Sequence, residues 1–154
     1  MNLIIANRQG VKKIDLRSLK KITTAVLAEL KIADAMLEIN LLGAKEMAAL
    51  NETFLHHDGP TDVITFDYAS AGSKLHGEIF ICVDVAVLQA KEFETHWQSE
   101  IVRYVVHGVL HLLGHDDTNA TVRQRMKREE NRLMRKLAEK FSLAQISRPP
   151  KLRA

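Results

Sequence analysis

The sequence predicts an α+β fold, a single domain in which a mixed sheet of about four strands packs with about five helices. Two observations predict this class. Segments with the composition of strands are interspersed with segments of helical periodicity, without strict alternation or an internal repeat. The chain of 154 residues also has the size of one domain. We expect that domain to cover residues 1–146 and residues 147–154 to form a disordered tail.

The first third of the chain predicts two strands and two helices. Residues 2–7 form a short apolar segment that predicts a strand, and Asp15 can cap a helix over residues 16–30. Residues 36–42, which read MLEINLL, predict the second strand. Residues 44–54 predict the second helix, because apolar side chains recur there three and four residues apart.

The middle of the chain predicts two more strands and a third helix. Residues 63–68 and 78–83 are rich in the β-branched and aromatic side chains that favour strands. The Gly and Ser residues between them predict a loop over residues 69–76. Residues 85–96 predict the third helix, and a fourth follows from residue 101.

The fourth predicted helix carries a polar stripe on an otherwise apolar rod. Arg103, His107 and His111 are four residues apart and therefore lie on one face. Two imidazoles at this spacing can direct ring nitrogens at one cation, whereas burying them without partners is unfavourable. Gly114 offers the left-handed conformation that ends a helix, so the His and Asp residues after it can approach the same point. The alternative, a pair of hydrogen-bonded core histidines, leaves this cluster unexplained.

The pattern predicts a catalytic metal site on a central helix and the turn that follows it. Three protein ligands and an open position are typical of catalytic sites, whereas structural sites are closed. Gly108 stands where a zincin would carry its catalytic Glu, so the HExxH signature is absent. The sequence also lacks a glycine-rich phosphate loop and a GxSxG elbow.

Charge is distributed unevenly along the chain. Residues 121–154 hold 11 Lys or Arg against three acidic residues, a net charge of +8, whereas the first 120 residues have a net charge of −5. This asymmetry predicts a polyanionic partner, with nucleic acid the first candidate. The alternative is a solvated helix face with a disordered end. On a helix predicted over residues 121–141, the candidates for RNA contact are Arg125, Arg128, Arg132 and Arg135.

The sequence also bears on the cellular compartment. Cys82 is the single cysteine and cannot form an intrachain disulfide, which favours a reducing environment. The first ten residues lack the basic start of a signal peptide, and no apolar run approaches the roughly 18 residues of a membrane span. We therefore expect a soluble, cytoplasmic protein without a membrane partner.

Four segments together resemble a known family. The segment HGVLHLLGHDD is similar to the signature of the YbeY family, bacterial metal-dependent endoribonucleases that mature ribosomal RNA. LNETF, PTDVITF and GEIFICVDVA agree with further family segments in order and spacing. The resemblance implies an α+β fold with one zinc ion per chain in a cleft. It also implies hydrolysis of single-stranded RNA in maturation of the 3′ end of 16S rRNA, with the small ribosomal subunit as partner.

The resemblance implies three metal ligands, and this chain departs from the family at the third. The family ligands are the two His of HxxxH, here His107 and His111, and a His six residues further on. That position is Asp117 in this chain. A carboxylate is a competent zinc ligand, so we expect Asp117 to be the third ligand, with His115 as the alternative. The carboxylate makes the site one unit more negative than the family pattern.

A second departure concerns the group that would act on the RNA phosphate. The family has an Arg directly after LNETF, whereas this chain has Leu55, followed by His56 and His57. One of these histidines, with His57 the candidate, could replace the missing cation. The alternative is a surface loop with chance histidines.

Other polar residues near the two histidines have open roles. Arg103 could stabilise charge on the phosphate or could pair with a carboxylate, and the sequence favours neither. Thr61 and Asp62 could shape their loop or orient a ligand His through its second ring nitrogen, as could Asp116.

Two other functions remain open at this point. One is a metal hydrolase of peptides or small molecules, which the basic tail and the missing HExxH Glu disfavour. The other is a ribosome-assembly factor that binds RNA and uses its metal to organise the fold.

Overall fold

The computed structural model of the protein describes residues 1–116 and 118–147. Within them it contains four strands and five α-helices, which confirms the predicted α+β class and the expected counts. The strands are β1 (Asn2–Arg8), β2 (Asp34–Leu42), β3 (Val63–Asp67) and β4 (Lys74–Cys82). The α-helices are α1 (Leu16–Glu29), α2 (Ala44–Leu55), α3 (Val83–Glu92), α4 (Trp97–Leu112) and α5 (Ala120–Lys140), and a short 3₁₀ helix, η1, covers Leu143–Ile146.

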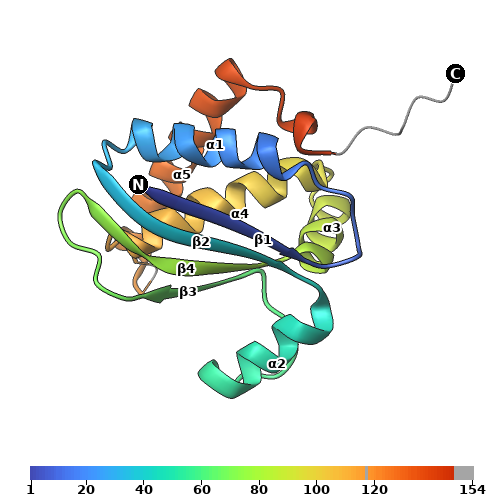
Figure 1. Cartoon of the computed structure of the whole chain (residues 1–154). Coiled ribbons are helices and arrows are strands. Elements are labelled where there is room, and N and C mark those ends of the chain that lie inside the picture. Colours follow the sequence, from blue (N-terminus) through green and yellow to red (C-terminus); the bar gives the residue numbers. More distant parts are fainter. Residues whose placement is uncertain (117, 148–154) are drawn as a thin grey trace, which may run out of the picture.

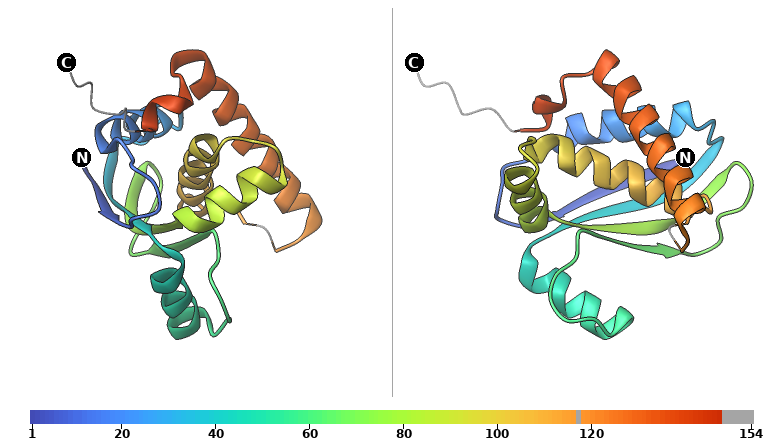
Figure 2. Two further views of the ribbon diagram at one scale, coloured as in Figure 1. Left: turned by 90° about the vertical axis from the view of Figure 1, so that its right-hand side faces the viewer. Right: turned by 180° about the vertical axis from the view of Figure 1, so that it is seen from behind.

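The four strands form one mixed sheet in the order β1, β2, β4, β3. β1 and β4 both run parallel to β2, whereas β3 pairs with β4 in the antiparallel direction. Helices α1, α4 and α5 lie over one face of the sheet, and α2 lies on the other side (Figure 1). The views of Figure 2 show the same division, with α4 between the sheet and α5.

Helix α4 forms the centre of the hydrophobic core. Its Ile101, Val105 and Val109 have no exposed surface and belong to the cluster that α1, α5 and the sheet share. Gly108 faces β4, where a Cβ atom would lie 2.8 Å from Cδ1 of Ile79. The close approach of helix and strand therefore requires Gly at this position. A side chain at residue 108 would enter the core, which explains why no zincin-type Glu is present.

Several element bounds differ from the sequence prediction for tertiary reasons. β4 begins at Lys74, within the predicted loop, because residues 74–76 pair with Asp34 to Met36 of β2. α3 ends at Glu92, since Glu94 adopts a left-handed conformation with φ of 53°. Asp15 is the N-cap of α1 as predicted, and its carboxylate accepts from the backbone N–H of Arg17 and Ser18.

The chain beyond α5 returns to the body of the domain. Ser147 bridges Ile14, and the side-chain amide of Gln98 donates to its hydroxyl at 2.7 Å. Residues 148–154, most of the predicted tail, lie outside the described residues. No helix in the described part of the chain is long and apolar enough to cross a membrane.

Candidate metal centre

Helix α4 presents His107 and His111 on one face. Their ring centroids are 6.4 Å apart, and the ring planes are inclined at 43°. The His107 side chain is about one third exposed, and His111 is exposed. The structure therefore places the two predicted ligands that it describes side by side on one face of α4.

Glu130 of α5 fixes the orientation of His107. One carboxylate oxygen of Glu130 lies 3.0 Å from Nδ1 of His107, and Glu130 itself is only 5% exposed. When Nδ1 donates its proton to this carboxylate, the lone pair of the ring lies on Nε2. A buried carboxylate behind a histidine is a common support for a metal ligand, because it fixes the tautomer and raises the basicity of the ring.

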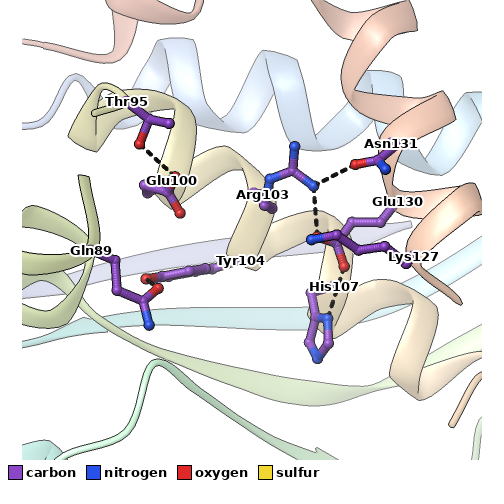
Figure 3. Close-up of polar contacts among 9 residues, drawn as sticks. All are labelled: Gln89, Thr95, Glu100, Arg103, Tyr104, His107, Lys127, Glu130 and Asn131. Carbon is purple, nitrogen blue, oxygen red and sulfur yellow. Dashed lines mark hydrogen bonds and ion pairs between the residues drawn. The ribbon is translucent and has the colours of Figure 1, made fainter. Parts of the chain in front are cut away.

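Arg103 completes this arrangement as the partner of Glu130. Its guanidinium donates to the second carboxylate oxygen of Glu130 at 2.8 Å and to the side-chain oxygen of Asn131 at 2.9 Å (Figure 3). Lys127 adds a weaker ion pair at 3.8 Å. Burial raises the pKa of Glu130, but hydrogen bonds from His107 and Arg103 outweigh this effect and hold the pKa below its ordinary value. Of the two roles open to Arg103, the structure therefore shows the carboxylate pair.

His111 is supported from the sheet rather than from α5. The hydroxyl of Thr65, on β3, lies 3.5 Å from Nδ1 of His111, at the limit of a hydrogen bond. Nδ1 of each histidine therefore faces a side chain of the protein. The chemistry of these donors fits zinc, for which imidazole nitrogen is a preferred ligand.

Sequence reasoning missed both supporting residues. Glu130 occupies a position of α5 between the buried Met126 and Met134, where a helical apolar stripe would ordinarily continue. A charged residue within that stripe was a signal for a buried partner. Thr65 carried no comparable signal, because Thr is common in strands.

The residues that were expected to orient a ligand have more local contacts. Asp62 accepts from the backbone N–H of Val63 at 2.8 Å and from the Thr61 hydroxyl at 3.3 Å. These bonds shape the entry to β3. Asp116 is half-buried in the turn that follows Gly114, whose φ of 97° confirms the left-handed conformation predicted there.

The third ligand stays a prediction. Asp117 lies outside the described residues. Among residues 1–116 and 118–147, no three His, Cys, Asp or Glu side chains lie close enough to hold a metal ion, so His115 does not form such a group with His107 and His111. His115 instead lies near α5, where its charge helps to lower the pKa of Glu129 after the larger effect of Arg132.

The structure does not bring His57 to this centre. His56 is the left-handed C-cap of α2, and the described contact of His57 is a backbone hydrogen bond to Asn51. The C-terminal end of α2 points away from α4, on the other side of the sheet (Figure 1). Both histidines are exposed. The role proposed for His57 in place of the family Arg thus gains no geometric support.

The four predicted RNA-binding arginines lie together along α5. A shallow groove of about 470 Å³ is lined by Arg125, Arg128, Arg132 and Arg135 with Glu129 and Asn131. Arg132 forms a two-point pair with Glu129 through Nε and Nη2. The others are exposed. The groove therefore presents a row of guanidinium groups on α5, the helix whose Glu130 contacts His107.

A larger cleft opens directly beside His107. Its volume is about 510 Å³, within the range of small-molecule sites. It lies between α3, α4 and α5. Its lining comprises Asp62, Gln89, Phe93, Thr95, Glu100, Arg103, Tyr104, His107, Arg123, Met126, Lys127 and Glu130.

Comparison with known proteins identifies the family of this chain. The family described as Endoribonuclease YbeY matches residues 4–138. The chain belongs to the endoribonuclease YbeY family. Endoribonuclease YbeY of Chlorobium luteolum is 39% identical over 95 residues, which cover 62% of this chain and 69% of the relative. Endoribonuclease YbeY of Syntrophotalea carbinolica is 32% identical over 144 residues, which cover 89% of this chain and 96% of the relative.

A solved structure supports the fold of the YbeY family here. The solution structure of protein TM1509 from Thermotoga maritima superposes with a TM-score of 0.66 at 26% identity, covering 91% of each chain. The family resemblance read from the four sequence segments is therefore confirmed. The names of the relatives also confirm the predicted enzyme class, an endoribonuclease.

Proposed function

We propose that this YbeY-family chain is a zinc-dependent endoribonuclease that cleaves single-stranded RNA, and that its substrate is ribosomal RNA at the 3′ end of 16S rRNA in the small ribosomal subunit. The observation that supports the metal centre best is the buried Glu130 behind His107. The names of the relatives support RNA as the substrate. His107, His111 and Asp117 would hold one zinc ion per chain.

Each residue of the centre has a distinct task in this proposal. Zinc, when bound, would act as a Lewis acid toward a phosphodiester. Glu130 keeps the Nδ1 proton of His107 in place, and Thr65 does so more weakly for His111. Arg103 balances the charge of Glu130 and thereby allows that carboxylate to stay ionised while buried. Arg103 is thus a positioning residue in this proposal.

The groove on α5 would supply affinity for the RNA backbone. Guanidinium groups spaced three and four residues apart can contact successive phosphates, and each contact releases counterions. Replacing all four arginines by Gln should weaken binding of single-stranded RNA and flatten its salt dependence. If the salt dependence of binding is unchanged but turnover falls, these arginines act in the cleavage reaction and not in RNA binding.

The central experiment compares metal content and RNA cleavage in the same preparations. We expect the wild-type protein to bind one zinc ion and to cleave single-stranded RNA in preference to duplex RNA, and not to cleave casein. His107→Ala and His111→Ala should lose both properties, because each removes one of three ligands. His96→Ala, which changes an exposed histidine at the start of the same helix, is the matched control.

Each alternative function predicts a different result. Cleavage of casein without cleavage of RNA would support a peptide hydrolase. RNA binding without cleavage in a zinc-loaded protein would support an assembly factor. Full zinc occupancy in both alanine variants would reject the metal centre itself.

A further inference from the structure

The cleft beside His107 has two ends of opposite character. At the His107 end it is lined by the cationic Arg103 and Lys127 together with the carboxylate of Glu130 that pairs with both, so these three groups have a net charge of +1. At the other end it is lined by Glu100, Gln89 and Asp62, which carry acceptor oxygens. Figure 3 shows this separation, with Gln89, Thr95 and Glu100 on one side of Tyr104 and the cationic side chains on the other. Two helical turns, about 10 Å along the axis, separate Glu100 from His107.

The acceptor end is held in place by local hydrogen bonds. The hydroxyl of Thr95 donates to Glu100 at 2.7 Å, and Glu100 is only 8% exposed. The phenol of Tyr104 donates to the side-chain oxygen of Gln89. Burial raises the pKa of Tyr104, and the nearby charges of Asp62 and Glu100 raise it further. The two carboxylates therefore act on the same part of the cleft.

An exposed aromatic ring completes this end. Phe93 lines the cleft at the C-cap of α3, and 63% of its surface is exposed. Its exposed face on the wall of the cleft is therefore accessible to a planar ligand. Planar bases stack on such rings, which is the usual way in which proteins hold single-stranded RNA.

We propose that the acceptor end of the cleft binds one nucleobase of the RNA strand, stacked on Phe93 and donating an exocyclic amino group to Glu100 or Asp62. This inference rests on the proposed endoribonuclease function, and it identifies a base preference for that reaction. Adenine, cytosine and guanine carry an exocyclic amino group, whereas uracil does not. The one donor on the pairing edge of uracil, N3–H, lies between two carbonyl oxygens that a carboxylate repels, so uracil is disfavoured in this position. The phosphate of the same nucleotide then faces the cationic end beside His107.

The test measures base preference in cleavage and in binding. Zinc-loaded protein is incubated with a pool of randomised single-stranded RNA, and the ends of the products are sequenced. Binding of phosphorothioate-linked RNA oligonucleotides, which resist hydrolysis, is followed by fluorescence anisotropy. We expect the wild-type protein to disfavour uracil at one position near the cut by about tenfold.

Two pairs of variants separate stacking from hydrogen bonding. Phe93→Ala should weaken binding about tenfold, whereas Phe93→Tyr keeps the ring and should retain it. Leu88→Ala is the matched control, because Leu88 is 64% exposed on the same helix and does not line the cleft. Glu100→Gln supplies an N–H group that can donate a hydrogen bond to a carbonyl oxygen of uracil, so the discrimination against uracil should fall. Asp62→Asn tests the second acceptor independently of any effect of Glu100 on folding.

The outcomes distinguish this inference from the function on which it rests. A wild-type protein that does not cleave RNA rejects the proposed function. Cleavage with no base preference, or a preference that Phe93→Ala and both acceptor variants leave unchanged, overturns the nucleobase site while the endoribonuclease stands.

Discussion

Replacing Glu130 by Gln is expected to weaken zinc binding far more than the small change in size suggests. The carboxylate accepts from His107 at 3.0 Å and from Arg103 at 2.8 Å, one bond on each oxygen. A Gln amide has only one oxygen. If that oxygen faces Arg103, the NH₂ group faces Nδ1 of His107 and the ring proton must move to Nε2, the atom that would bind zinc in the proposed centre. If the amide is reversed, its NH₂ group faces a guanidinium.

The expected loss of zinc affinity can be estimated from the effect of similar carboxylates behind metal-binding histidines. Loss of a carboxylate behind a metal-binding histidine typically costs 10–100-fold in metal affinity, or about 1.4–2.7 kcal/mol. Removal of the acceptor also takes away the hydrogen bonds that Arg103 and His107 make to the carboxylate of Glu130, which is 5% exposed. Hydrogen bonds to charged groups are worth about 1.5–3 kcal/mol each, so loss of both in Glu130→Ala should destabilise the zinc-free protein by about 3–6 kcal/mol.

Three measurements check this reasoning. Competition with a chelating dye gives zinc affinity, chemical denaturation without zinc gives the free energy of unfolding, and ¹⁵N shifts of the imidazole give the tautomer of His107. Glu129→Gln is the matched control, because Glu129 is adjacent in sequence but pairs with Arg132. If Glu130→Gln binds zinc within twofold of wild type and its His107 keeps the Nδ1 proton, the carboxylate does not orient this ligand.

Three further predictions address the cap, the helix packing and the third ligand. Asp15→Ala should reduce the free energy of unfolding by about 1 kcal/mol near neutral pH. Hydrogen bonds from Ser18 lower the pKa of Asp15 in the folded protein. The stability difference between wild type and variant, measured by denaturation, should therefore disappear as the pH falls below the unfolded-state pKa of 3.8. Gly108→Ala should cost about 1–3 kcal/mol because its Cβ meets Ile79, and Ile79→Val in the same chain should recover part of it. Asp117→Ala should lose zinc while His115→Ala keeps it; the reverse pattern of metal content would move the third ligand to His115.

Much of this molecule follows from local chemistry that the sequence displays. Helical spacing placed His107 and His111 on one face, and the cap at Asp15 and the left-handed turn at Gly114 depend only on nearby backbone. The fold class followed from interspersed strand and helix patterns, because each pattern reports which side of a segment is buried. The family segments HGVLHLLGHDD and PTDVITF added the enzyme class.

Contacts between distant segments could not be read in this way. β4 begins at Lys74 because β2 offers it a partner 40 residues earlier in the chain, at Asp34. Glu130 lies 23 residues from His107, and its position behind the ring depends on how α5 crosses α4. The cleft beside His107 likewise exists only where α3, α4 and α5 meet. Sequence periodicity specifies which face of a helix or strand is apolar. Which polar side chains meet a partner from another element is decided only when whole helices and strands pack together.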